Sequence, residues 1–168
     1  MTLRITLGID PGQTGAIAVL ADGDFAGFID MPVVPRPAGG NHVDAATLAA
    51  ALRGIFSAHP GAHVFGVLEE VGAMPKQGVS SMFRFGESYG VIRGVLGAVG
   101  IPYMQVRPER WKKYLQLSGK EKDCARTVAI QRHPTAAAHL GRKKDIGRAD
   151  ALLIATWAQI TEQVARAA

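Results

Sequence analysis

Residues 3–22, LRITLGIDPGQTGAIAVLAD, contain the pattern that decides the fold of this chain. The first eight alternate and then become continuously apolar, as in a strand that enters a covered sheet, and PGQTG is typical of a turn into a second strand. Another turn near Gly23 leads into a third strand, FAGFIDM, at residues 25–31. We therefore predict an antiparallel three-strand meander at the N-terminus.

The rest of the chain alternates helices with strands. Residues 43–59 have apolar side chains at helical spacing, with Asp44 as a possible N-cap, and residues 63–71, HVFGVLEEV, indicate a buried strand. Residues 32–42, PVVPRPAGGNH, are expected to form a loop because they are rich in Pro and Gly. A loop and helix over 72–100, a strand at 101–108, two short helices and a long terminal helix follow. The pattern predicts an α/β fold, a mixed five-stranded sheet with helices on both faces.

Size and composition favour a single intracellular domain. The 168 residues, 48% of them hydrophobic, suit one domain over 1–168 with a packed core. With one cysteine, Cys124, the chain has no intramolecular disulfide framework and no Cys-rich metal site. The N-terminus does not resemble a signal peptide, and no apolar run is long enough for a membrane span. We expect a cytoplasmic protein without membrane association.

The charge favours a polyanionic partner. The 19 Lys and Arg residues exceed the 14 Asp and Glu residues, which gives a net charge of +5. Because many basic proteins bind no nucleic acid, this charge alone is a weak indication of DNA binding.

Acidic residues interrupt or border three apolar elements. Asp10 ends the first strand, where the alternative is a turn-forming Asp before proline. Glu69 and Glu70 end the buried strand, and period-two alternation sends them to opposite faces, so that at most one joins Asp10; the alternative is a strand end reaching solvent. Asp150 begins the terminal helix, where an acid is also favoured by the helix dipole.

Taken together, these carboxylates predict a metal site. Oxygen ligands from two strand ends and a helix suit Mg²⁺ or Mn²⁺, and a pair of such ions activates water and stabilises the leaving oxygen in phosphodiester hydrolysis. Small alanines at 149 and 151 would let the helix approach the sheet.

The motifs GIDPGQTGAIAVL, VLEEV followed by FRFGESYGVIRGVL, and RADALLIATW resemble the RuvC family of Holliday junction resolvases, in the RNase H-like superfamily, over almost the whole chain. The resemblance implies a metal-dependent endonuclease, a crossover junction endodeoxyribonuclease of DNA recombination and repair, with Asp10, Glu69 and Asp150 as metal ligands. The small size suits a bacterial or bacteriophage member. The family has another acid three residues before the helix Asp, where this chain has Gly147; the nearest acid, Asp145, is predicted as a fourth catalytic residue if it lies in the preceding loop.

Two basic segments, 107–123 and 142–148, are candidate phosphate contacts, although a solvated basic face is an equal alternative. The loop before the 80–100 helix is where the family reads junction DNA. Phe83 and Phe85 would touch unstacked bases there, with Arg84 on a phosphate, unless both rings are core or one ring is core and the other exposed. The predicted DNA-binding residues are Lys76, Gln77, Phe83, Arg84, Arg107, Lys112, Lys113, Lys120, Lys122, Lys143, Lys144 and Arg148.

A four-way junction has two strands to cut, and this chain offers carboxylates for one active site, so we expect a homodimer. The helix over residues 80–100 is the candidate interface, unless its small and apolar face packs on its own sheet; these residues are Gly90, Val91, Gly94, Val95 and Ala98.

Other functions remain open at this point. The carboxylates also suit another RNase H superfamily nuclease, acting on RNA:DNA hybrids or in transposase-like strand transfer. GIDPGQTG resembles the phosphate-binding turn of actin-like nucleotide-binding proteins, which need two such halves. A noncatalytic DNA-binding protein is disfavoured by the three acids.

Overall fold

The computed structural model describes residues 2–37, 39–72 and 78–167, with side chains up to residue 162. The predicted meander is confirmed: β1 (Arg4–Ile9), β2 (Ala16–Ala21) and β3 (Asp24–Asp30) pair antiparallel in sequence order. The β2–β3 turn is tight, with positive φ at Asp22 and Gly23, as two-residue hairpin turns require.

Two parallel strands complete the sheet. β6 (His63–Glu69) pairs with β1, and β7 (Tyr103–Val106) pairs with β6, which gives the order β3-β2-β1-β6-β7. The mixed five-stranded sheet is therefore confirmed. Because β1 and β6 run parallel with Ile9 beside Leu68, the residues that follow these two strands lie at the same end of the sheet.

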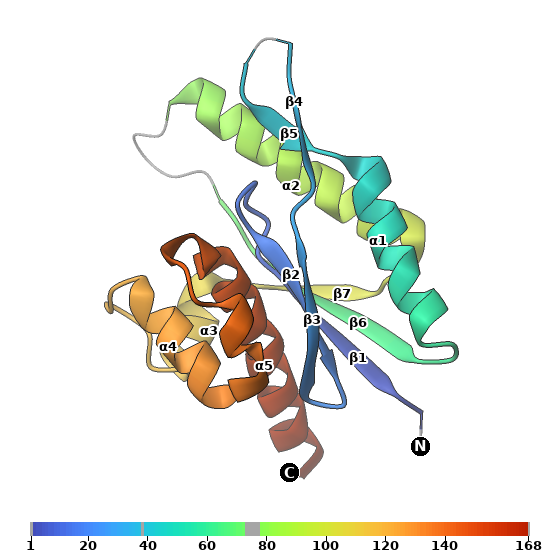
Figure 1. Cartoon of the computed structure of the whole chain (residues 1–168), viewed down its shortest axis with the longest axis vertical. Coiled ribbons are helices and arrows are strands. Elements are labelled where there is room, and N and C mark those ends of the chain that lie inside the picture. Colours follow the sequence, from blue (N-terminus) through green and yellow to red (C-terminus); the bar gives the residue numbers. More distant parts are fainter. Residues whose placement is uncertain (1, 38, 73–77, 168) are drawn as a thin grey trace.

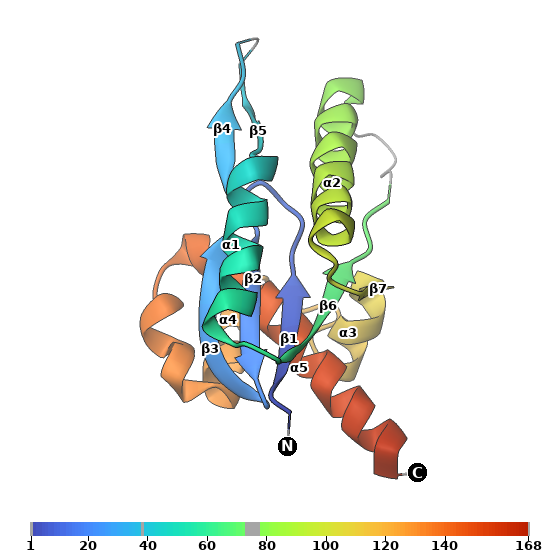
Figure 2. The same cartoon turned by 90° about the vertical axis from the view of Figure 1, so that its right-hand side faces the viewer.

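Two helices cover one face of the sheet, α1 (Ala45–Ala58) and α2 (Val79–Val99), as Figure 2 shows. Asp44 is the N-cap of α1 and accepts a hydrogen bond from the Ala46 backbone N–H, as predicted. Apolar side chains of both helices pack on alternate residues of the strands. The helix residues include Leu48, Leu52, Ile92 and Leu96, and the strand residues include Ile5 and Leu7.

The other face is covered mainly by the long helix α5 (Ile146–Ala167), with shorter helices beside it (Figure 1). Ala16, Ala18 and Leu20 of β2 face this layer, and the residues between them face the first layer, so that the sheet is buried on both sides. The shorter elements are α3 (Pro108–Tyr114), α4 (Asp123–Arg132) and two 3-10 helices, η1 (Pro134–His139) and η2 (Lys143–Asp145).

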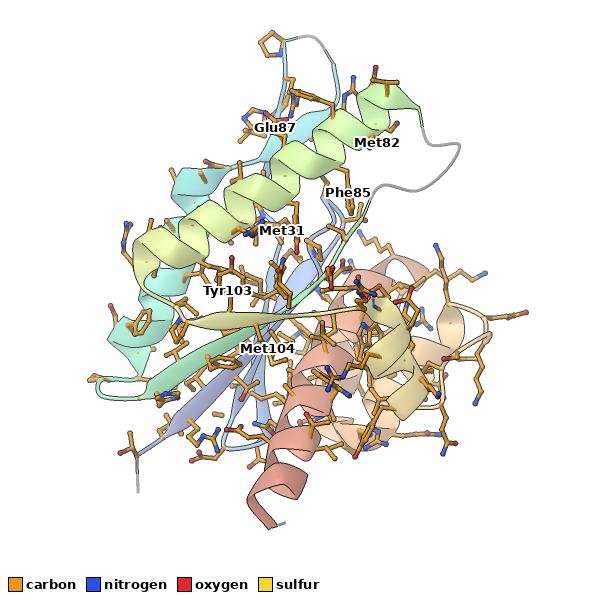
Figure 3. All side chains as sticks on the ribbon, turned by 180° about the vertical axis from the view of Figure 1, so that it is seen from behind. Met31, Met82, Phe85, Glu87, Tyr103 and Met104 are labelled. Carbon is orange, nitrogen blue, oxygen red and sulfur yellow. The ribbon has the colours of Figure 1, made fainter. Side chains whose placement is uncertain are left out.

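One sequence-based prediction of the fold is wrong. The expected loop over residues 32–42 contains a small hairpin, β4 (Val33–Pro35) and β5 (Asn41–Val43). Arg36 of this hairpin forms an ion pair with Glu87 of α2, and Figure 3 shows Glu87 on the side of α2 next to the hairpin. Pro35 lies within β4, whereas Pro37, Gly39 and Gly40 lie in the connection between the two strands, where no ladder hydrogen bond is needed.

Candidate active site

Asp10 directly follows β1, and the turn after it holds its carboxylate at the sheet end. The Gly12 backbone N–H donates to Asp10 Oδ1 at 3.3 Å, and the Asp10 N–H donates to the Ala16 carbonyl at 3.0 Å. A Cβ at Gly15 would lie 2.3 Å from the Asp10 carbonyl oxygen, so this turn needs glycine there. Burial raises the pKa of Asp10, against the lowering effects of the Gly12 hydrogen bond and of Lys112.

Glu69 is the last residue of β6, the strand next to β1. Its Oε1 accepts a hydrogen bond of 2.9 Å from the indole Nε1 of Trp111. Burial raises the pKa of Glu69, Trp111 lowers it and Asp10 raises it. Glu70 has a different partner, because Arg107 Nε lies 3.4 Å from Glu70 Oε2. The two glutamates thus diverge, as the alternation predicted.

Asp150 reaches the same end of the sheet because α5 lies directly on β1. A Cβ at Gly8 would stand 2.0 Å from the Ala151 carbonyl oxygen and 2.5 Å from the Ala155 nitrogen, so only glycine permits this crossing. The pKa of Asp150 is raised to about 7, first by burial and then by repulsion from Asp10 and Glu69. The three predicted ligands are therefore electrostatically coupled.

The position of the missing fourth acid is sterically closed. A Cβ at Gly147 would lie 2.5 Å from the Thr14 carbonyl oxygen and 3.1 Å from Asp10 Oδ2. Real Cβ atoms essentially never approach another heavy atom closer than 3.0 Å, so a side chain at position 147 would require the backbone to move.

Asp145 does not join the three carboxylates. It is 4% exposed, and its carboxylate accepts hydrogen bonds of 2.8 Å from Arg142 Nη2 and from the Arg142 backbone N–H. The hydrogen bond from the Arg142 side chain is the main reason that the pKa of Asp145 is lowered. Arg148, a predicted DNA contact, binds both carboxylate oxygens of Asp30 at 2.6 Å. These four residues form an ion-pair cluster beside the site.

A cavity of about 520 Å³ brings the two basic segments together. Asp10 and Asp150 line it together with five lysines from α3, the α3–α4 connection and η2; these are Lys112, Lys120, Lys122, Lys143 and Lys144. Glu69 does not line the cavity but is coupled to both aspartates through their charges. The sequence had suggested each basic segment separately, and the structure makes them walls of one pocket.

The carboxylates suit a divalent cation but do not yet enclose one. Within the described side chains, no three Asp, Glu, His or Cys residues are gathered tightly enough to hold a metal. In the same part of the chain, no ion pair within 4.0 Å neutralises Asp10, Glu69 or Asp150. Burial raises the pKa of all three carboxylates, Asp10 further raises that of Glu69, and both raise that of Asp150, so a hard cation would stabilise the group.

The other predicted DNA contacts are scattered. Lys76 and Gln77 lie outside the described residues. Phe83 is 70% exposed near the start of α2, Phe85 is half-buried, and Arg84 is exposed beside the Gly40 backbone. Arg107 and Lys113 are exposed on or beside α3 and do not line the cavity. Of the alternatives for the F-x-F pair, the observed one has Phe83 exposed and Phe85 more buried.

Sequence reasoning missed the role of Trp111. It stands between Arg110 and Lys112, in a segment for which the sequence predicted only phosphate contacts by basic residues. The indole is fully buried and touches a predicted metal ligand. The signal that could have found it is a lone large apolar residue within a run of charges, which favours an inward position.

The chain is similar in sequence to a named protein and in fold to two solved structures. No protein-family model matches the chain. It is 38% identical over 122 residues to the Holliday junction resolvase MOC1, chloroplastic, of Chlamydomonas reinhardtii. The match covers 72% of this chain and 14% of that relative, so the chain spans a small part of the relative's length.

Two solved structures of Thermus thermophilus RuvC, one in complex with a Holliday junction substrate, resemble the chain along nearly its whole length. Each has a TM-score of 0.55 and a sequence identity of 15%. The match covers at least 95% of this chain and 96% of the RuvC chain. The chain has the RuvC fold. The resemblance to the RuvC family is thus confirmed by homology to a named resolvase and by this fold. Within the RuvC fold, β1, β6 and α5 bring Asp10, Glu69 and Asp150 to one end of the sheet.

Proposed function

We propose that the chain is a metal-dependent endonuclease that resolves four-way DNA junctions by paired nicks. The observation that carries the proposal is the pocket in which carboxylates from β1 and α5, coupled to Glu69, face five lysines. A pocket with acids at its base and cations on its walls suits a phosphodiester, because the lysines attract the backbone and the acids hold the catalytic cation. The named resolvase relative supports the same substrate class.

The proposed ligands are Asp10, Glu69 and Asp150, for Mg²⁺ or Mn²⁺, with two ions per site. When bound, such ions supply a water of lowered pKa and stabilise charge on the leaving oxygen. Asp145 is assigned to holding Arg142, and with it the η2 turn that carries Lys143 and Lys144, rather than to the metal.

The lysines of the pocket are the proposed phosphate contacts. Lys112 lies close enough to lower the pKa of all three acids, and it lines the same cavity as Lys143 and Lys144 of η2. Arg107 and Lys113 would extend the DNA path along α3. Phe83 and Arg84, exposed near the start of α2, would meet bases and phosphate near the branch point, together with Lys76 and Gln77.

A homodimer through α2 is proposed as the assembly. Val95 is buried in the chain's own core and Val91 packs against that core, contrary to their predicted place in the interface. Gly90, Gly94 and Ala98 are exposed, and a Cβ on either glycine would meet no atom within 4 Å. This open strip of small residues would let two α2 helices approach closely.

Cytoplasmic location stays a prediction, while the relative's name places that protein in the chloroplast. In the described part of the chain, none of the helices combines the length and apolar character needed to cross a bilayer.

The deciding experiment compares substrates of matched sequence: a labelled four-way junction, a flap, a linear duplex and an RNA:DNA hybrid, each with and without Mg²⁺. We expect Mg²⁺-dependent, symmetrically paired nicks in the junction and little cleavage of linear duplex. Preferential cleavage of the hybrid would favour another RNase H superfamily nuclease. Thermal stabilisation by ATP without any nuclease activity would favour the nucleotide-binding alternative.

A further inference from the structure

A fully buried tryptophan lies behind the predicted metal ligand of the central strand. Trp111 is 0% exposed, although it belongs to the basic helix α3. β7 pairs with β6 so that Val106 lies beside Glu69, and α3 begins two residues later at Pro108. One turn of α3 therefore returns the indole to the end of β6, where Nε1 donates to Glu69 Oε1 at 2.9 Å.

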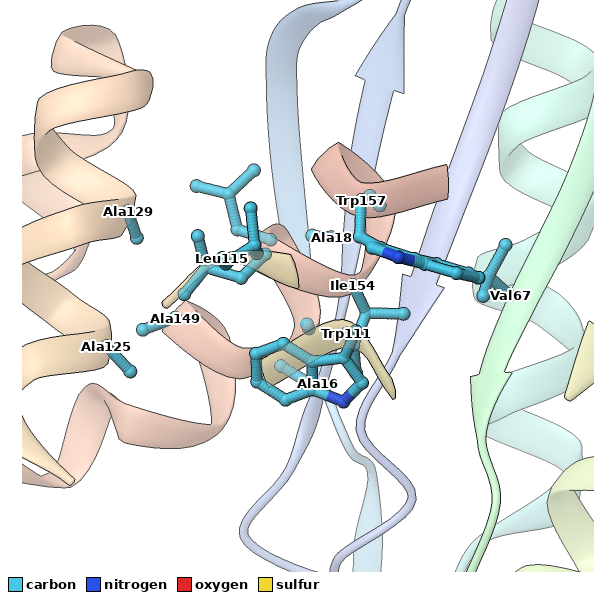
Figure 4. Close-up of a cluster of buried hydrophobic side chains, with 14 of the residues drawn as sticks. Ala16, Ala18, Val67, Trp111, Leu115, Ala125, Ala129, Ala149, Ile154 and Trp157 are labelled. Atoms are coloured by element: carbon cyan, nitrogen blue, oxygen red, sulfur yellow. The ribbon is translucent and has the colours of Figure 1, made fainter. Parts of the chain in front are cut away.

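The core fixes the position of the indole. Trp111 packs in the cluster under α5 with Leu115, Ala125 and Ala149, and Figure 4 shows its ring between α3 and those alanines. An indole has one N–H donor and no acceptor, and a buried N–H requires a partner. Glu69 is that partner, so a rigid ring restrains one oxygen of the carboxylate.

The same ring also contacts the pocket wall. Lys112 Nζ lies 5.1 Å from the centroid of the Trp111 ring, within the range of a cation–π contact, and Lys112 lines the cavity. Trp111 thus contacts both an acid of the site and a cation of its wall, without being exposed itself.

We propose that Trp111 is a positioning residue that fixes Glu69 so that only its Oε2 is offered to a cation. This inference rests on the proposed function, because it requires Glu69 to be a ligand. The restraint matters because Gly147 leaves no room for a fourth acid, so each of three carboxylates carries a larger share of the binding. Groups that orient metal ligands typically change affinity about 10–100-fold.

The first test is spectroscopic and uses the intact protein. With two tryptophans, the chain gives two indole N–H signals in a ¹H–¹⁵N correlation spectrum. Addition of Mg²⁺ to DNA-free protein is expected to move the Trp111 signal and leave that of Trp157 in place. Glu69→Gln should move the Trp111 signal without metal and remove its response to Mg²⁺.

The second test measures Mn²⁺ affinity by calorimetry on DNA-free protein. Trp111→Phe keeps an aromatic ring but removes the donor, and we expect affinity to fall about 10–100-fold. Trp157→Phe is the matched control, since Trp157 is 2% exposed in the same cluster and its ring contacts Arg110 instead. Its Mn²⁺ affinity should equal that of the wild type.

The outcomes separate this inference from the proposed function. A Trp111 signal that ignores saturating Mg²⁺, in a protein whose junction cleavage needs Mg²⁺, would overturn the positioning role and leave the proposed function standing. Wild-type Mn²⁺ affinity in Trp111→Phe would do the same. Absence of both metal binding and cleavage in the wild type would overturn the proposed function itself. If Trp111→Phe fails to fold, the indole signals of the wild type and of Glu69→Gln decide.

Discussion

Gly147 lies directly against Asp10, so that a Cβ at position 147 would stand 3.1 Å from Asp10 Oδ2. The same Cβ would lie 2.5 Å from the Thr14 carbonyl, which belongs to the turn that holds Asp10. The first turn of α5 and the β1–β2 turn are therefore in backbone contact. The site has room for three acids from three elements and none for the fourth that the family motif includes.

Gly147→Ala should destabilise the protein by about 1–3 kcal/mol, because the methyl group meets backbone that cannot move aside. Urea unfolding measures this loss. Gly54→Ala is the control: Gly54 is an exposed glycine within α1 with open space around its Cβ, and alanine there should stabilise by up to about 1 kcal/mol. Full stability of Gly147→Asp would show that α5 can move away from the turn.

Asp10→Asn, Glu69→Gln and Asp150→Asn should each reduce junction cleavage below detection while the protein still folds and binds the junction. Each change removes a charge of the proposed metal site with little change of shape. Gel-based cleavage and junction-binding assays on the same preparations measure both effects.

Glu70→Gln and Asp145→Asn are the comparison variants for that experiment. Glu70 pairs with Arg107 and should keep most activity. Asp145→Asn should lower stability by about 1–3 kcal/mol through Arg142 and keep the metal requirement. Greater loss of cleavage in Glu70→Gln than in Glu69→Gln would mean that the wrong glutamate was assigned.

The metal-free protein should lose stability as pH rises. The pKa of Asp150 is raised from 3.8 to about 7, so its protonated form favours folding below about pH 4 and this contribution disappears as pH passes through 7. At about 1.4 kcal/mol per pKa unit, the contribution is at most about 4 kcal/mol. Chemical unfolding between pH 4 and 8 should show the decline in wild type.

Asp150→Asn tests the origin of that decline. The variant does not ionise at this position, so its stability should depend less on pH and exceed that of the wild type at pH 8. Saturating Mg²⁺ should restore stability to the wild type and not to the variant. An identical pH profile for both proteins would remove Asp150 as the cause.

Lys120→Ala with Lys122→Ala should weaken junction binding and reduce the slope of log affinity against log salt by about 0.9 for each phosphate that the protein no longer neutralises. Lys143→Ala with Lys144→Ala, at residues that line the same cavity, should act alike. Fluorescence anisotropy at several salt concentrations measures the slope. Arg53→Ala, an exposed change on α1 across the sheet, should leave it unaltered.

Gly94→Arg should convert a dimer into a monomer and abolish paired cuts, because a long charged side chain would stand on the open strip of α2. Sedimentation at several concentrations measures the assembly, and Gly54→Arg on α1 is the matched control. In mixed dimers, one Asp10→Asn subunit should leave single nicks. A wild-type protein that is monomeric at working concentration and still makes paired cuts would contradict the dimer.

Local sequence patterns determined most of the fold. Alternation that becomes a continuous apolar run predicted β1, turn motifs predicted β2 and β3, and an apolar run predicted β6. Spacings of three and four predicted α5, because burial of one helix face follows from the sequence of that element alone. The short hairpin β4–β5 was not predicted, because the prolines and glycines of residues 32–42 also suit a loop. The hairpin also contacts α2 through the ion pair of Arg36 with Glu87. A pattern of neighbouring residues cannot predict this long-range contact.

The sequence by itself also indicated acids that gather at one end of the sheet, since Asp10 and the Glu69–Glu70 pair end strands and Asp150 begins a helix that can lie on them. The family resemblance selected Glu69 from the pair. Only the tertiary structure decided what surrounds these acids. Trp111 reaches Glu69 across 42 positions, and Gly147 closes the place of a fourth acid against the turn after β1. The physical reason is that hydrogen-bond partners and steric limits depend on which distant backbones come within a few ångströms, and that is set by the packing of α3 and α5 on the sheet.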